Sequence, residues 1–146
     1  MSRRLDVLKA IKQMIAVALP NADVIGLDND DAIPTRPTPG GRVIVRSGDP
    51  GEPEVDLCPL TYNFEHEIPL ELTGWDAGNK TSEEVLDEMM VPIGDAIEQD
   101  RTLGGLCIWM EARSPLTDDV FLEGATPADR ADLVIVATYA TTNPLT

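Results

Sequence analysis

The chain has 146 residues and is most simply a single domain over residues 1–146, long enough to bury a core without metal or disulfide staples. Its formal net charge of −15 argues against general binding to nucleic acid, because no basic stripe is available to displace the counterions of the phosphates. Aromatic residues make up only 4% of the chain, so we expect a largely aliphatic core.

The first third of the chain predicts one helix and two short strands. Apolar side chains recur at spacings of three and four over residues 4–19, which predicts an amphipathic helix. Residues 22–27 predict a short edge strand, and residues 42–46 predict a β-branched strand flanked by arginines. Between the two strands, residues 28–41 combine acids, prolines and glycines, a composition that predicts a long loop.

The central predicted element is a long strand over residues 62–72, which follows a linker over residues 47–60. Apolar and polar side chains alternate strictly along it, the pattern of a β-strand with one buried face. A helix of the same sequence would bury glutamates. Glu65, Glu67 and Glu71 lie on the polar face, which we expect to be an acidic surface that meets water or a partner protein.

The second half of the chain predicts one more helix and two more strands. Thr81 and Glu84 fit a capping box ahead of a helix whose apolar stripe covers residues 85–97. Strands are expected at residues 106–112 and 133–142. The long excursion between these strands, residues 113–132, has the length that is typical of functional or disordered loops.

The order of these elements predicts an α+β fold, a two-layer sandwich with long loops. Its sheet is expected to contain four mainly antiparallel strands, built from two antiparallel pairs. The two helices are expected to pack on one face of that sheet, because the apolar side of each element has to be covered by another.

No residue pattern in the chain indicates catalysis, a cofactor or a bound metal. His66 is the only histidine and lies on the apolar face of the long strand, which favours a structural role over a catalytic one. The aspartates within residues 28–33 hint at a calcium loop, but the ligand and glycine positions of an EF-hand are not satisfied there. Cys58 and Cys107 have no metal-ligand spacing and do not indicate an oxidising compartment.

Several acidic and aromatic side chains are candidates for contact with a partner protein. The glutamates of the long strand form either a solvated face or an interface, and Trp75, on a predicted loop, either packs or anchors an interface. Asp118 and Asp119, in the long excursion, are expected to form a solvated turn. The candidate interface residues are therefore Glu65, Glu67, Glu71, Trp75, Asp118 and Asp119.

No uninterrupted apolar run approaches membrane-spanning length, and no signal-peptide pattern follows the N-terminus. We therefore expect a protein that is made and kept in a cytoplasm and has no membrane partner.

Four short stretches, in order along nearly the whole chain, carry a family resemblance. They are Leu5-Asp6-Val7-Leu8-Lys9-Ala10-Ile11, Pro59-Leu60-Thr61-Tyr62, Asp100-Arg101-Thr102-Leu103-Gly104-Gly105-Leu106 and Val136-Ala137-Thr138-Tyr139-Ala140-Thr141. Together with the order of elements, they resemble the tail terminator (tail completion) proteins of long, non-contractile-tailed phages and of gene transfer agents.

The resemblance implies a structural virion protein of the tail or neck, assembled in the cytoplasm of a bacterial host. Such a protein caps the tail tube as an oligomeric ring, expected to be a hexamer, and joins the tube to a head or neck connector or stopper protein. DNA passes through the ring without sequence-specific binding. We expect a negatively charged lumen, which repels the genome and lets it slide.

Three other classes of function stay open on the sequence. Another head–tail connector or minor tail protein would differ from a terminator in its stoichiometry and its position along the particle. A small acidic enzyme, or its regulatory subunit, would lose turnover when His66 or Cys107 is replaced. An acidic binding module would capture a basic partner in a salt-sensitive manner.

Overall fold

The computed structural model describes residues 2–27, 39–76, 78–120 and 128–146. Within these residues the chain forms two α-helices, one 3-10 helix and seven strands. They are α1 (Arg3–Ala18), β1 (Asp23–Ile25), β2 (Arg42–Val45), β3 (Glu54–Leu57), β4 (Leu60–Trp75), α2 (Ser82–Gln99), η1 (Leu103–Gly105), β5 (Trp109–Ala112), β6 (Leu116–Val120) and β7 (Ala128–Thr141). The predicted α+β class and its two α-helices are confirmed.

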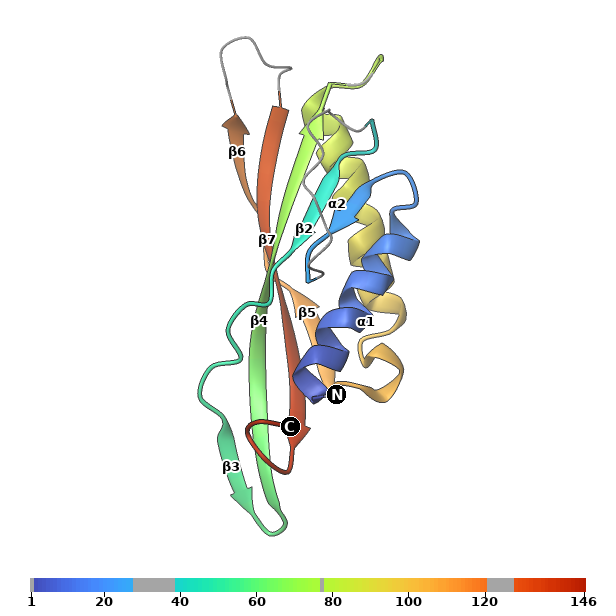
Figure 1. Cartoon of the computed structure of the whole chain (residues 1–146). Helices are drawn as coiled ribbons and strands as arrows, with labels where there is room; N and C mark the ends of the chain where they lie inside the picture. The colour runs from blue at the N-terminus through green and yellow to red at the C-terminus, as the bar shows by residue number, and fades with distance from the viewer. Residues whose placement is uncertain (1, 28–38, 77, 121–127) are drawn as a thin grey trace.

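The seven strands form one mixed, open sheet around the pair β4 and β7. The strand order is β1-β2-β4-β7-β5, with β3 also beside β4 and β6 also beside β7. All 14 residues of β7 pair with β4 in antiparallel register, from Tyr62 opposite Thr141 to Trp75 opposite Ala128. Figure 1 shows these two strands as one long twisted ribbon, with the shorter strands along its two edges.

The predicted number of four strands is wrong. The four strands counted in the predicted sheet correspond to β2, β4, β5 and β7, and the pairs β2–β4, β4–β7 and β7–β5 are antiparallel. The short edge strand predicted at residues 22–27 is confirmed as β1. β1 adds a parallel pairing with β2, while β3 and β6 come from residues predicted to be linker and loop. β3 alternates polar and apolar residues over only four positions, too short a run to predict a strand, and β6 does not alternate. Both strands are defined by their pairing with β4 and β7.

β4 realises the predicted alternation and extends it at both ends, from residue 60 to residue 75. Successive side chains of a strand point to opposite faces, so every second residue enters the core. The core side of β4 carries the buried residues Phe64, His66, Ile68, Leu70 and Leu72. Across the sheet they continue into Leu133, Ile135, Ala137 and Tyr139 of β7, which are also buried.

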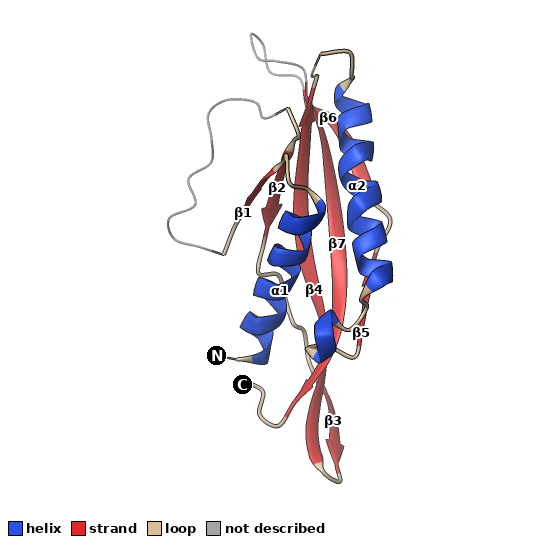
Figure 2. Cartoon of the chain, turned by 90° about the vertical axis from the view of Figure 1, so that its right-hand side faces the viewer, coloured by secondary structure: helices blue, strands red, loops and turns tan. Residues whose placement is uncertain are grey.

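Both helices cover the same face of the sheet, as the two views in Figures 1 and 2 show. α2 begins as predicted, because the Thr81 hydroxyl accepts a hydrogen bond from the Glu84 amide at 3.2 Å. The same hydroxyl donates to the Glu84 carboxylate at 3.4 Å. Gly74 lets α2 approach β4 closely, since a Cβ there would lie 2.8 Å from the Ser82 carbonyl oxygen.

Two loop regions differ from expectation, and a third lies mostly outside the described residues. The predicted strand over residues 106–112 begins only at Trp109, because the chain first makes η1, in which Gly104 has a positive φ of 68°. The predicted excursion over residues 113–132 contains β6 and the first part of β7, while its residues 121–127 lie outside the described residues. Most of the predicted loop over residues 28–41 also lies outside them.

β3 and the start of β4 form a hairpin that projects beyond the helices, seen at the lower end of the molecule in Figures 1 and 2. We call residues 54–63 the projecting hairpin. Its register pairs Glu54 with Asn63 and Leu57 with Leu60. The predicted linker over residues 47–60 is therefore in part a strand.

Candidate functional site

The face of the sheet opposite the helices is covered by no described helix (Figure 1). We call it the open face. Strand alternation and cross-strand register assign its residues, since directly paired residues point to the same side. From β2, β4, β5 and β7 and the residue after β5 it includes Arg42, Ile44, Arg46, Glu65, Glu67, Pro69, Glu71, Thr73, Trp75, Trp109, Glu111, Arg113, Arg130, Asp132, Val134, Val136 and Thr138.

The centre of the open face is apolar. Pro69 is paired with Val134, Val136 stands opposite Glu67, and Ile44 stands opposite Glu71. These four apolar side chains are half-buried by their neighbours on the sheet. An apolar centre within a charged border is the composition of many protein interfaces, in which the core loses water and the rim stays solvated.

Ion pairs, most of them between neighbouring segments of the sheet, make up much of the charged border. Arg113 lies 2.6 Å from Glu67, Arg46 lies 3.0 Å from Glu71, and Arg130 lies 3.1 Å from Glu71. Arg130 also reaches Asp132 at 3.2 Å. Glu71 thus accepts from two guanidinium groups that come from opposite sides of β4.

The open face is therefore not the acidic surface that the sequence predicts. Glu67 and Glu71 do lie on it, but arginines of neighbouring strands compensate both carboxylates. Glu65 lies on the same side of β4 and is exposed. Because those arginines are distant from the glutamates in sequence, alternation along one strand could not reveal the compensation.

Trp75 belongs to the open face and not to a loop. It is the last residue of β4, paired with Ala128, and its ring lies 4.9 Å from the Arg42 guanidinium. A guanidinium at this distance over an indole ring makes a favourable cation–π contact. A second contact of this kind joins Arg101 to Trp109 at 4.8 Å, at the edge strand β5.

Asp118 and Asp119 lie on a strand, so the expectation of a solvated turn is wrong. They belong to β6, in register with Arg130 and Asp129 of β7. Their side chains lie outside the described part of the structure. The structure thus brings four of the six candidate interface residues onto the open face and places the backbone of the other two at its edge.

Replacing Glu71 with glutamine is expected to lower the free energy of unfolding by no more than about 1 kcal/mol. Its pairs with Arg46 and Arg130 are solvent-accessible, so water and salt screen much of their attraction. Urea denaturation at low and high salt would measure the loss, which should shrink as salt rises. Glu65→Gln on the same strand is the matched control, and an undiminished loss at high salt would contradict this account.

His66 is fully buried, and both nitrogens of its ring are hydrogen-bonded. The Ser47 carbonyl can only accept, so Nε2–H donates to it at 2.6 Å. Nδ1 then accepts from the Tyr139 hydroxyl at 3.0 Å in the neutral ring. Burial lowers the pKa of His66 and raises the pKa of Tyr139, because desolvation disfavours the charged form of each group.

The described residues contain no group of three or more His, Cys, Asp and Glu side chains arranged to hold a metal ion. Cys107 is buried, its thiol lies 3.5 Å from the Arg101 carbonyl, and burial raises its pKa. Cys58 is exposed at the tip of the projecting hairpin. In the part of the chain described, no helix is long and apolar enough to cross a membrane.

No protein-family model matches the chain, and no curated protein matches it either. The surfaces described above are therefore the basis for a functional proposal.

Sequence reasoning missed two features of these surfaces. The first is the set of arginines on the open face, although the spacing of Arg42 and Arg46 by four residues did place both on one side of a short strand. The second is the exposed apolar side of the projecting hairpin, where Val55, Leu57 and Leu60 are at least 47% exposed. The signal for it was the uncharged stretch 57–62, which lies in a region otherwise rich in acids.

Proposed function

We propose that this chain is a tail terminator, a structural protein that caps the tail tube of a phage or gene transfer agent as a ring. The observation that carries the proposal is the amount of ordered surface without internal cover, namely the open face and the projecting hairpin. A subunit of a closed ring that caps a tube needs surfaces for its two neighbours and further surface for the proteins above and below the ring. The four short stretches that resemble tail terminators are the reason for proposing a ring on a tail tube.

The ring is proposed to be a hexamer of identical subunits that lies between the tail tube protein and a connector or stopper protein of the neck. The open face suits a protein contact because Glu67, Glu71 and Asp132 are already paired with arginines within the subunit. Docking another protein there removes water from balanced ion pairs and from the apolar centre, and leaves no carboxylate of these pairs without a counter-charge.

The proposed acidic lumen is better supported by α2 than by the open face. α2 carries no basic residue, and its exposed side presents Glu83, Glu84, Asp87, Glu88 and Glu98. Lys80 pairs with Glu88 at 2.8 Å at the start of the helix. A channel lined by such helices would repel the phosphates of DNA and let the genome pass without sequence-specific contacts.

Electron microscopy of the purified protein, alone and mixed with the tail tube protein of the same particle, tests the proposal. We expect closed rings of one copy number that sit at the end of the tube. A strict monomer in both samples would contradict a ring-forming cap. Subunits bound along the side of the tube would favour another tail component, and a lumen lined by lysine and arginine would contradict the proposed channel.

A further inference from the structure

We propose that the apolar side of the projecting hairpin docks into the groove between α1 and α2 of a second copy of the chain. This inference rests on the proposed ring and identifies the contact between neighbouring subunits. Both partners of the contact are exposed in the single chain, and they lie on different parts of it. Such a contact joins subunits head to tail, as a ring requires.

The projecting hairpin has one apolar side and one acidic side. Val55, Leu57 and Leu60 point to the side of the sheet that the helices cover elsewhere, and their exposed fractions are 48%, 78% and 47%. Glu54 and Asp56 point to the opposite side. The Asn63 amide donates to the Asp56 carboxylate at 3.0 Å on that side.

The apolar side of the hairpin continues the buried face of the sheet beyond the end of the helices (Figure 2). Phe64 and His66, a few residues further along β4, are covered there, whereas Leu57 and Leu60 are not. The hairpin thus presents core-like side chains without the helices that would complete the core. Because a helix pair covers this face of the sheet elsewhere, a helix pair is also the matching cover for the hairpin.

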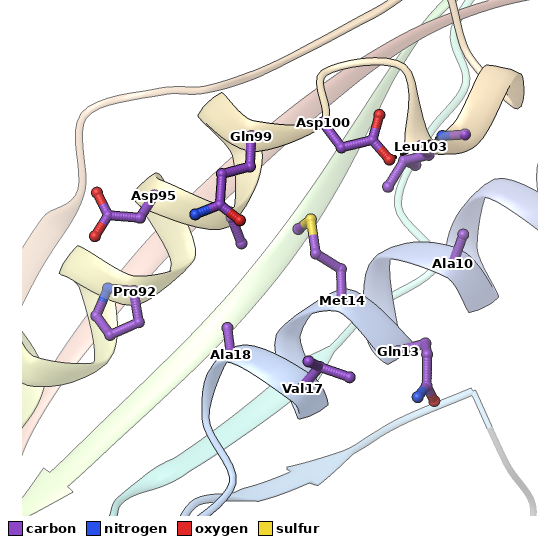
Figure 3. Close-up of a pocket in the computed structure, with 12 residues that line it drawn as sticks. Ala10, Gln13, Met14, Val17, Ala18, Pro92, Asp95, Gln99, Asp100 and Leu103 are labelled. Atoms are coloured by element: carbon purple, nitrogen blue, oxygen red, sulfur yellow. Dashed lines mark hydrogen bonds between the residues drawn. The ribbon is translucent and has the colours of Figure 1, made fainter.

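The groove between α1 and α2 has a volume of about 660 Å³ and lies on the outside of the helices. Its apolar lining includes Ala10, Met14, Val17, Ala18, Pro92 and Leu103. Figure 3 shows Met14 reaching from α1 into the space between the helices, with Pro92 and Gln99 on the α2 side. Val17 is 69% exposed, although it is an aliphatic residue in the last turns of α1.

The charges favour a hairpin of the same chain as the occupant. Two copies that each carry −15 repel one another, so their contact has to be made where few charges meet. The carboxylates at the groove, Asp95 and Asp100, would face residues 57–62 of the hairpin, which carry no charge. Glu54 and Asp56 point away from the groove in this arrangement.

The hairpin cannot fill the groove of its own chain. It is an extension of β4, a continuous strand that β7 pairs from Tyr62 to Trp75, and it projects away from the two helices in both views. A copy displaced along the ring can offer its groove without any change of fold. Each subunit then uses its hairpin on one neighbour and its groove on the other.

Disulfide trapping in the full chain tests this contact, because the exposed Cys58 lies at the hairpin tip and Cys107 is buried. In Val17→Cys, mild oxidation should link Cys58 of one copy to residue 17 of the next. We expect linkage at least about tenfold faster than in Asp87→Cys, an exposed site on another side of α2, since docking raises the effective thiol concentration. Non-reducing electrophoresis should show a ladder of dimers, trimers and larger species.

Further variants decide between the outcomes. Val17→Cys combined with Cys58→Ser should give no ladder, and adding Leu57→Ser to Val17→Cys should slow the linkage about tenfold by weakening docking. Leu57 is exposed, so its replacement should leave the unfolding curve unchanged. Equal linkage of Val17→Cys and Asp87→Cys, or a disulfide within one chain, overturns the contact. Rings on the tube without this linkage would support the proposed function and contradict the contact. A ladder without tube binding would support the contact and contradict the proposed function.

Discussion

Replacing Ile68 with alanine is expected to lower the free energy of unfolding by about 2–5 kcal/mol. Ile68 has no exposed surface and stands opposite Ile135, which is also fully buried, at the centre of the β4–β7 pair. Truncation removes buried methyl and methylene groups and leaves a cavity that rigid paired strands cannot close. Urea denaturation followed by circular dichroism measures the loss.

The adjacent residue Glu67 supplies the matched control. Glu67→Ala removes an exposed ion pair with Arg113, so its effect is expected to stay below about 1 kcal/mol. The contrast between neighbouring positions tests the two-faced character of β4 directly. Similar losses at both positions would contradict the assignment of Ile68 to the core and Glu67 to the open face.

Lowering the pH from 7.5 towards 5 is expected to destabilise the fold through His66. Burial is the largest cause that lowers its pKa, with Arg4 adding to it; the Ser47 hydrogen bond and Asp49 act in the opposite direction. In the unfolded chain the His66 imidazole takes up a proton near pH 6.5, whereas in the folded chain it does so only at a lower pH. The contribution of His66 is thus complete above about pH 6.5 and is lost as the pH falls through the lowered pKa, with a slope of up to about 1.4 kcal/mol per pH unit.

His66→Gln is the control for this pH dependence. A glutamine amide can donate to the Ser47 carbonyl and accept from the Tyr139 hydroxyl, but it does not titrate. Unfolding free energies of both proteins are measured at several pH values between 5 and 7.5. The difference between the two proteins separates the pH dependence due to His66 from that due to the carboxylates. Identical pH profiles would show that protonation of His66 does not oppose folding.

The sequence predicts those elements whose signal is local. The alternation around residue 68 places β4 and its faces correctly, and the capping box places the start of α2 at Ser82. The periodic apolar residues likewise place α1. In each case the spacing of apolar residues within a single segment decides which face of that helix or strand is buried in the core.

The candidate site was predictable only in part. Glu65, Glu67 and Glu71 share one side of β4 as expected, because a period of two residues fixes the side of a strand. That this side is charge-balanced depends on Arg113 and Arg130, which arrive on segments far along the chain. The register of β7 against β4 brings Arg130 to Glu71, and nothing in the local pattern encodes that register.

By itself, then, the sequence determined the α+β class, the two helices and the buried face of the central strand, because amphipathic periodicity is a property of each segment. Only the tertiary structure decided that seven strands pair, that residues 54–57 form an edge strand with an apolar side left exposed, and that arginines offset most of the acids on the open face. The physical reason is that main-chain pairing and counter-charges at these positions are supplied by residues distant in sequence.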